Sequence, residues 1–421
     1  MRRGAEILLT LAAGALLRAA VAWATPIPAE DGVNYLWMAE RFAAGDARAA
    51  LSEVFPPLLP LLAAPAVALG LEAFRAVQCV AILAGTLAIL PLAAAAQRLA
   101  PEAWRAALWL AVTMPLPVRQ AAECYTEPLY LLLAALALVS ALERRWVAAG
   151  MLAGFAFWTR PEGVLLPLAF ALATPRAGLR LLAPCGVAVL ALAAWRAQQG
   201  LGFSVSAKFE FLQAQLGREL GSNLLALPWT CVEAFYLLAP LALLGAFRAR
   251  RQIPAGLWWL LALHAGLVLA YLARRRFLVS WTPVVLPLAA LGLCSLRARW
   301  RTPLLWLCVV GHAALTLRVQ DADRIAERRI GEYLRGRELA SDMTRVLYYA
   351  GQRPLPPRRF NAEELVGMAE ARGVEFCVLG SHRATTPEVV ARLGAAWMEE
   401  ALPDALTAVA GARGILVLRR R

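Results

Sequence analysis

Long blocks of apolar residues, separated by short charged connections, constrain the fold of this chain more than any other feature. Examples lie at Leu131–Leu142, Leu181–Ala194 and Leu257–Leu272, and 60% of the 421 residues are hydrophobic, with a mean hydropathy of +0.58. Helices of about 20 such residues match the roughly 30 Å hydrocarbon core of a bilayer. A surface helix of a soluble protein would instead alternate apolar and polar faces. The blocks therefore predict an all-α polytopic membrane protein.

Eleven segments have the apolar character expected of transmembrane helices. They are 5–24, 73–96, 102–119, 127–142, 146–159, 161–174, 180–197, 223–246, 254–273, 277–295 and 302–319. The block 56–70 is left out because it is only 15 residues long and holds four prolines, and so short a stretch is more often interfacial or re-entrant. We interpret the N-terminal run as an uncleaved first span, since it is longer than the apolar part of a usual signal peptide.

The positive charge of the chain has the pattern of a topology signal. The net charge is +14, and it comes from arginine, because Lys208 is the only lysine. Most of the arginines lie between apolar blocks, which argues against a nucleic-acid partner and marks the cytoplasmic side of a membrane. With eleven spans, the segments 25–72, 198–222 and the tail after 320 face the opposite side. Arg274–Arg276 also lie on this side, contrary to the preference of arginines for the cytoplasmic side. This exception is a hint that the three arginines have a function.

The last hundred or so residues predict a separate small domain. Residues 320–337 are charged and helix-like, Asn361 could begin a helix that ends at Gly373, and Val374–Leu379 and Gly414–Leu418 indicate short buried strands. We therefore expect a membrane domain over 1–319, with its first outer loop at 25–72, and an extracytoplasmic α/β domain over 320–421. The seven cysteines form no CxxC pair, so neither a disulfide framework nor a zinc site is expected.

Carboxylates and arginines gather on the predicted outer face. Glu30 and Asp31 follow the first span, at the start of a stretch whose apolar residues, Tyr35 among them, share one helical face. Glu127 lies at the outer end of the fourth span. Each acid has a plain alternative explanation as a helix cap, and Arg274–Arg276 could be snorkelling flanks of a span. Together, however, they combine a possible general base with groups that bind phosphate.

The order of several short elements resembles the clan C (GT-C) glycosyltransferases, membrane enzymes that use lipid-linked sugars and include protein O-mannosyltransferases and the aminoarabinose transferase of lipid A. The elements are Asp31-x3-Tyr35 with Gly45, Phe55-Pro56-Pro57-Leu58, Thr126-Glu127, Gly150-x3-Gly154 with Thr159-Arg160-Pro161-Glu162-Gly163, Arg276-Phe277 with Pro283 and Pro287, and Met343–Gly351. Two departures stand out. Phe55 replaces a lysine that contacts the carrier phosphate in some relatives, and the second acid of the first motif is displaced to Glu30.

The resemblance implies inverting transfer of a hexose or pentose from a polyprenyl-phosphate carrier to a lipid, glycan or protein acceptor, on the outer face of the plasma membrane. Asp31 would be the general base, with Glu30 as the alternative. Glu127 would position the acceptor or, in the metal-using branch of the family, help to bind a divalent cation; no other cofactor is implied. The substrate-binding candidates are Tyr35, Arg160, Glu162, Arg274, Arg275 and Arg276, and a structural Arg160–Glu162 salt bridge stays open.

Two other classes of function remain at this point. A secondary transporter would favour internal repeats and charges in the middle of its spans; the sequence has no convincing repeat, and His264 and His312 are its main polar oddities within spans. In a non-catalytic membrane scaffold, Asp31 and Glu127 would only cap helices. Substitution of the loop acids separates the enzyme from both alternatives.

Overall fold

The computed structural model describes residues 2–51, 55–202, 220–271, 274–317, 322–353, 362–380, 396–412 and 415–421. Contacts between residues divide the chain into two units. The first contains Met1–Ala24 and Met38–Val319, and the second contains Thr25–Trp37 and Gln320–Arg421. The sequence placed one boundary between 319 and 320. The contacts in addition assign Thr25–Trp37, the start of the predicted first outer loop, to the C-terminal unit.

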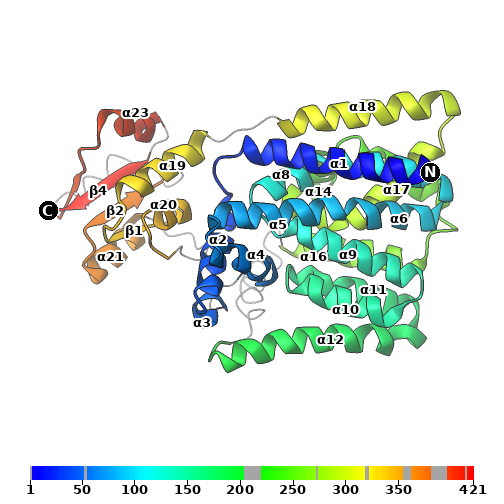
Figure 1. Cartoon of the computed structure of the whole chain (residues 1–421), viewed down its shortest axis with the longest axis horizontal. Helices are drawn as coiled ribbons and strands as arrows, with labels where there is room; N and C mark the ends of the chain where they lie inside the picture. Colours follow the sequence, from blue (N-terminus) through cyan, green and yellow to red (C-terminus); the bar gives the residue numbers. More distant parts are fainter. Residues whose placement is uncertain are drawn as a thin grey trace. The chain divides into compact units, whose positions relative to one another are not determined.

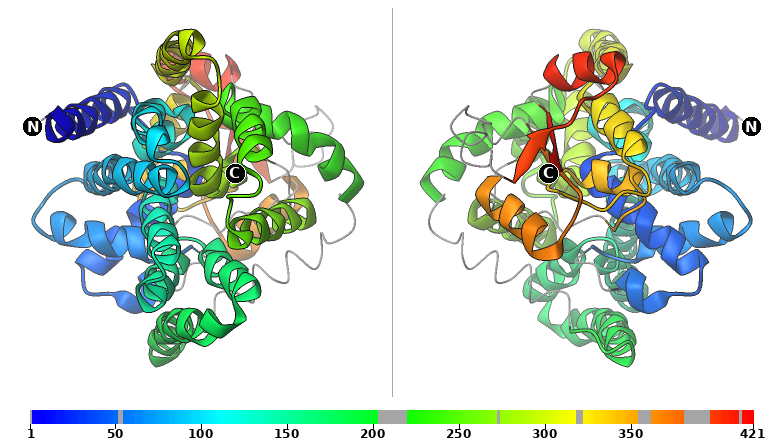
Figure 2. Two further views of the ribbon diagram at one scale, coloured as in Figure 1. Left: turned by 90° about the vertical axis from the view of Figure 1, so that its right-hand side faces the viewer. Right: turned by 90° about the vertical axis from the view of Figure 1, so that its left-hand side faces the viewer.

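The first unit is a bundle of apolar helices (Figure 1). Its elements are α1 (Arg2–Trp23), the end of α2 (Glu30–Ala43), α3 (Ala47–Leu51), α4 (Leu58–Ala68), α5 (Ala73–Leu87), α6 (Ile89–Leu99), η1 (Pro101–Ala103), α7 (Trp104–Thr113), α8 (Pro115–Ala122), α9 (Glu127–Leu142), α10 (Trp146–Phe157), η2 (Pro161–Val164), α11 (Leu165–Ala173), α12 (Pro175–Gln198), α14 (Leu220–Phe235), α15 (Leu238–Ala249), α16 (Ala255–Tyr271), η3 (Arg275–Trp281), α17 (Thr282–Cys294) and α18 (Ala298–Leu317). Figure 2 looks along the bundle and shows many of these helices end-on.

Small residues set the packing of this bundle, whose core is rich in alanine and leucine. The closest approach is between α15 and α17. A Cβ atom on Gly245 would lie 2.0 Å from the carbonyl oxygen of Leu288, and one on Gly292 would lie 1.9 Å from that of Leu241. The two backbones are therefore in direct contact, as small residues allow in membrane helix pairs, where lipid offers no hydrophobic driving force for association.

The lengths of the helices fit a multi-pass membrane protein. Among the described residues, four segments are long and apolar enough to cross a membrane, namely Arg3–Trp23, Ala73–Leu99, Pro175–Gln198 and Arg275–Cys294. Shorter apolar helices cover the predicted spans 127–142, 146–159, 161–174 and 254–273, and α4 covers the block that was left out. The total of eleven spans stays a prediction.

Two of the predicted spans are broken by proline. Residues 223–246, expected as one span, form α14 and α15, which are bent by 105°. At the break Tyr236 has a φ of +48°, and the ring of Pro240 would clash with the carbonyl of Tyr236 in a continuous helix. Residues 102–119 likewise divide into α7 and α8 at Met114, just before Pro115.

Arg18, in the middle of α1, satisfies the end of the broken helix α7. This side chain is 2% exposed. It donates hydrogen bonds to the carbonyl oxygens of Gly14 at 3.0 Å, Val112 at 3.3 Å and Ala111 at 3.5 Å. The carbonyls at a helix end have no partner within the helix, and in a bilayer a group left unpaired is costly. Arg18 therefore stabilises a break that Pro115 imposes.

The second unit contains a four-stranded mixed sheet with the strand order β1-β2-β4-β3. Its elements are the start of α2, α19 (Ala322–Tyr333), β1 (Leu339–Ser341), α20 (Thr344–Tyr349), α21 (Ala362–Arg372), β2 (Phe376–Leu379), β3 (Trp397–Glu399), α23 (Asp404–Ala412) and β4 (Leu416–Arg420). Strands β1 and β2 are parallel, and the other pairs are antiparallel. The expected strands near 374–379 and 414–418 correspond to β2 and β4.

Both faces of this sheet are covered, because successive side chains of a strand point to opposite faces. Phe376 and Val378 pack into a cluster with α19, α20 and α23, whereas Cys377 and Leu379 pack with α21. Figure 1 shows the strands between these two sets of helices. Gly373, with a φ of +65°, ends α21 as predicted, while Asn361, its proposed cap, lies outside the described residues. Burial raises the pKa of the Cys377 thiol to about 12, so this thiol stays protonated and structural.

We predict that Arg18→Met destabilises the first unit. Methionine keeps an unbranched aliphatic stem but has no hydrogen-bond donor, so it leaves the α7 carbonyls unpaired, which should cost about 1–3 kcal/mol of unfolding free energy. Thermal unfolding of the detergent-solubilised protein measures the effect. Arg251→Met removes the same charge from an exposed position and is the control. Equal melting temperatures for the two variants would show that the carbonyl contacts contribute nothing.

Candidate functional site

A buried guanidinium holds two carboxylates where α9 begins and α10 ends. Nη1 of Arg160 lies 2.5 Å from Oε1 of Glu127, and Nη2 lies 2.8 Å from Oε1 of Glu162. The side chain of Glu127 is 3% exposed, and those of Arg160 and Glu162 are each 11% exposed. The predicted Arg160–Glu162 pair is therefore present, and Glu127, which lies 33 residues before Arg160 in the chain, joins it.

Local sequence explains why these three side chains point to one place. Glu127 opens α9, with Pro128 in the first turn, where the missing N–H of proline costs nothing. Arg160 has extended backbone, and Pro161 then starts η2, which carries Glu162. Gly163 permits the sharp return, because a Cβ there would lie 2.3 Å from the backbone nitrogen of Phe157.

Phe277 connects this cluster to the arginines of η3. The guanidinium carbon of Arg160 lies 5.9 Å from the centroid of the Phe277 ring, and that of Arg276 lies 4.9 Å from it. Both distances fit a cation–π contact. Arg276 is half-buried, whereas Arg274 and Arg275 are exposed. The structure thus separates the arginine trio, and only Arg276 reaches the ring that Arg160 also contacts.

A further motif lies against the same turn. The backbone N–H of Leu58, the last residue of the Phe55–Leu58 element, donates to the carbonyl oxygen of Trp158 at 3.1 Å. Trp158 directly precedes Thr159 and Arg160. Four elements that are distant in sequence, which begin at Phe55, Thr126, Thr159 and Arg276, are therefore connected within the first unit.

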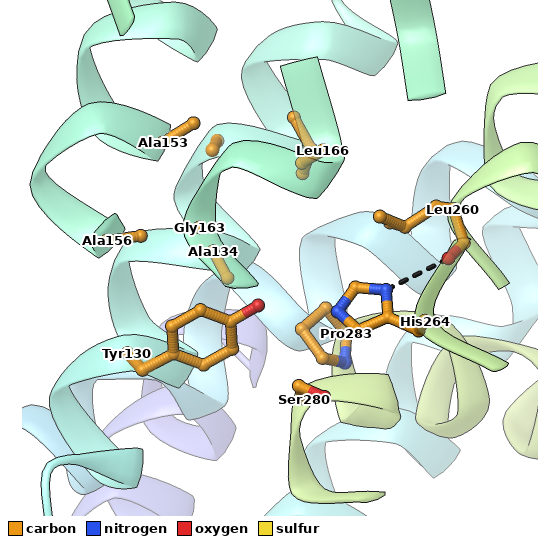
Figure 3. Close-up of a pocket in the computed structure, with 11 residues that line it drawn as sticks. Tyr130, Ala134, Ala153, Ala156, Gly163, Leu166, Leu260, His264, Ser280 and Pro283 are labelled. Carbon is orange, nitrogen blue, oxygen red and sulfur yellow. Dashed lines mark hydrogen bonds between the residues drawn. The ribbon is translucent and has the colours of Figure 1, made fainter. Parts of the chain in front are cut away.

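A small cavity lies beside this cluster. It has a volume of about 10 Å³, and its lining includes Tyr130, Gly163, His264, Ser280 and Pro283. In Figure 3 the Tyr130 hydroxyl and the His264 ring point toward the same space, and Nδ1 of His264 lies 2.9 Å from the carbonyl oxygen of Leu260. Such a volume holds about one water molecule, so this cavity is too small to hold a sugar.

The sequence analysis did not single out Tyr130, and it noted His264 only as a polar residue within a span. Tyr130 and His264 both lie within electrostatic range of Arg160 and Glu162. A weak signal was present, because Tyr130 lies three residues after Glu127, and residues with this spacing share one face of a helix.

Cys124, which lies three residues before Glu127, is unsuited to act as a nucleophile. Cys124 lies in the turn between α8 and α9, with a φ of +64°, and is fully buried. Burial, and then the charge of Glu123, raise the pKa of this thiol well above its ordinary range. Because a thiolate is the reactive form, covalent catalysis by Cys124 is disfavoured, and the chemistry of the region is carboxylate and guanidinium chemistry.

The loop acids belong to the second unit. Glu30 and Asp31 form the first turn of α2, as the amphipathic pattern predicted. Glu30 is exposed, Asp31 is half-buried, and Tyr35 is 5% exposed on the buried face of the helix. The structure therefore collects the candidate residues in two groups: the loop acids with Tyr35, and the four charges around Phe277.

The donor set around Arg160 favours anion and hydroxyl chemistry. Within the part of the chain that the structure describes, no three His, Cys, Asp or Glu side chains gather as a metal-ligand group. Glu127 and Glu162 instead share one guanidinium, which already takes an oxygen of each.

Comparisons with known proteins show which solved structures share the fold of this chain. No family model and no curated protein matches the chain. Solved structures do. The apo structure of ArnT from Cupriavidus metallidurans matches with a TM-score of 0.66 and 14% sequence identity, over 99% of this chain and 98% of that chain. The structure of the same protein bound to undecaprenyl phosphate matches with a TM-score of 0.65 and 16% identity, over 98% of this chain and 97% of that chain. The Archaeoglobus fulgidus oligosaccharyltransferase, in complex with Zn and sulfate, matches with a TM-score of 0.59 and 15% identity, over 88% of this chain and 68% of that chain.

These matches confirm the suspected resemblance at the level of fold. ArnT is an aminoarabinose transferase, and both neighbours are GT-C glycosyltransferases, the group suggested by the sequence elements. At 14–16% identity, the likeness shows that this chain has their fold.

We predict that Arg160→Gln destabilises the first unit by about 3–5 kcal/mol, because it leaves two buried carboxylates without their shared cation. The triple variant Arg160→Gln, Glu127→Gln, Glu162→Gln removes both charges as well and should recover part of the loss. Thermal unfolding in detergent compares the two variants. Should the triple variant unfold at the same temperature as Arg160→Gln, the ion pairs would not be the source of the effect.

Proposed function

We propose that this protein transfers a sugar from a polyprenyl-phosphate carrier to an acceptor on the extracytoplasmic face of the membrane. The observation that carries the proposal is the similarity of fold along 98% of the chain to an ArnT structure with undecaprenyl phosphate bound. The charged cluster around Phe277 supports it independently, because it places guanidinium groups and carboxylates together at helix ends rather than in the middle of spans.

In the proposed reaction Asp31 is the general base. A carboxylate oxygen of Asp31 takes the proton from the acceptor hydroxyl or amine, and the acceptor atom attacks the anomeric carbon of the sugar. The bond from that carbon to the phosphate oxygen breaks, and the bonding electrons leave with the polyprenyl phosphate. A single displacement of this kind inverts the anomeric configuration. Asp31 suits this role as a half-buried acid in the first turn of a helix.

Arg276 is the proposed holder of the leaving phosphate. Its guanidinium is half-buried against Phe277, and arginine matches phosphate through paired, charge-assisted hydrogen bonds. Contacts of this kind stabilise the charge that develops on the leaving group. Arg160 is committed to Glu127 and Glu162, so it orients the cluster, and Glu127 in turn positions the acceptor.

The side of the membrane follows from the arginines. The basic connections between the spans mark the cytoplasmic side, so the first loop and the C-terminal unit face outward from the plasma membrane. The acceptor is then a lipid, glycan or protein that reaches this outer surface. The alternatives, a transporter or a non-catalytic scaffold, require neither the loop acids nor the arginine beside Phe277.

We predict that Asp31→Asn abolishes most sugar transfer without loss of folding. Asparagine caps a helix about as well as aspartate, so membrane insertion and melting temperature should stay near native. Loss of a general base removes about 10²–10⁴ of the rate. The measurement is transfer from a radiolabelled polyprenyl-phosphate sugar to membrane acceptors by purified, reconstituted protein.

The control for this experiment is Glu30→Gln, which alters the neighbouring, exposed acid. If Glu30→Gln loses activity while Asp31→Asn retains it, Glu30 is the base. Native activity in both variants would refute catalysis by this loop and favour a scaffold or a transporter.

We predict that Arg276→Gln weakens donor use more than Arg275→Gln does. Loss of a charge-assisted hydrogen bond of about 1.5–3 kcal/mol should raise the KM for the lipid-linked donor by roughly 10–100-fold, while the KM for the acceptor changes little. Arg275 is exposed and one position away, which makes it a matched control for charge. Equal effects of the two substitutions would show that charge alone matters and that contact with phosphate does not.

A further inference from the structure

The C-terminal unit holds the chain segment that leads into Asp31. Arg345, in α20, donates from Nε to the carbonyl oxygen of Pro28 at 3.0 Å. Its Nη1 atom donates to Oε2 of Glu327, in α19, at 2.7 Å. The side chains of Arg345 and Glu327 are only 11% and 16% exposed. A guanidinium held by a half-buried carboxylate thus binds a backbone carbonyl that lies three residues before Asp31.

Further contacts act on the same segment. Nη1 of Arg328 lies 3.4 Å from the carbonyl oxygen of Pro26, and its guanidinium also lies over the ring of Tyr349, 5.3 Å from the centroid. On the first turns of α2, the guanidinium of Arg353 lies 5.2 Å from the ring centroid of Trp37. Residues of α19, of α20 and of the segment just after it therefore touch the chain on both sides of Asp31.

The Arg345 contact lies where α2 begins. The first hydrogen bond of the helix runs from the N–H of Val33 to the carbonyl oxygen of Ala29, at 3.1 Å. The preceding carbonyl, that of Pro28, accepts the Arg345 bond instead. Ile27 and Ala29 are each 1% exposed. Arg345 thus binds the backbone at the point where the chain enters α2, three residues before Asp31.

We propose that Arg345 is a positioning residue for sugar transfer: held by Glu327, it binds the Pro28 carbonyl and orients the first turn of α2, which carries Asp31. The proposal rests on the proposed function in that Asp31 is the base. On this proposal the C-terminal unit orients the catalytic acid, a role separate from proton transfer itself. Misplacement of a reacting group by about 1 Å can cost on the order of 10²-fold in rate.

The test compares Arg345→Gln with the charge exchange Glu327→Arg, Arg345→Glu. The exchange restores an ion pair between α19 and α20, but glutamate at position 345 cannot donate to the Pro28 carbonyl. If Arg345 positions Asp31, the exchange recovers the melting temperature, while kcat stays at least tenfold below native in both variants with the donor KM unchanged. If kcat recovers along with stability, the role of Arg345 is only structural, and the proposal fails.

Hydrogen exchange provides a readout that does not depend on activity. Arg345→Gln and the charge exchange should both accelerate amide exchange in residues 29–35, whereas Arg337→Gln, which removes an exposed pair with Glu375, should change neither exchange nor kcat. Arg345→Lys, with one cationic donor, should recover part of the protection. Unchanged exchange in Arg345→Gln overturns the proposal. If exchange is accelerated in Arg345→Gln but the native protein transfers no sugar, the contact of Arg345 with the segment before α2 stands and the proposed function is rejected.

Discussion

Arginine donating to main-chain carbonyls is the interaction on which this helical bundle depends. Each helix end leaves carbonyls without partners, and a bilayer supplies no water to bind them. Arg18 binds carbonyls at the end of α7, Arg119 binds those of Leu315 and Thr316 near the end of α18, and Arg196 binds those of Leu51 and Gly202. A planar guanidinium with five donors reaches several acceptors at once. The bundle can therefore contain short and broken helices.

Sequence reasoning located the elements better than it located their breaks. Apolar blocks predicted most helices of the first unit, and the alternation of small apolar runs and charged stretches predicted β2, β4 and α19. The sequence analysis did not predict the 105° bend within 223–246, although Pro240 indicates a break. Hydropathy is averaged over a window, so a single proline hardly changes it. The buried Arg18 was missed for the same reason. A charge within an apolar block gives no indication of which carbonyls, 93 and 94 residues later in the chain, it will bind.

The candidate site was predictable as a set of residues but not as an arrangement. Chain order and residue type identified Glu127, Arg160, Glu162 and Arg276. That Arg160 would bridge two carboxylates, or that Phe277 would lie beside two guanidinium groups, follows from helix packing. Close helix contacts at glycine, such as Gly150 against Leu181, set which helix ends meet. The assignment of Thr25–Trp37 to the C-terminal unit likewise depends on contacts formed by residues some 300 positions away.

The pairing around Arg160 also bears on which acid can act as the base. Oε1 of Glu127 lies 2.5 Å from Nη1 of Arg160, in a site where the Glu127 side chain is 3% exposed. A carboxylate held in such an ion pair has a fixed direction, which suits it to accept a hydrogen bond and so to orient a hydroxyl or amine. In the proposed reaction Asp31, in the first turn of α2, takes the proton instead. The two acidic motifs then have different physical requirements: an ion-paired carboxylate at Glu127, and at Asp31 a carboxylate that follows a backbone segment bound by Arg345.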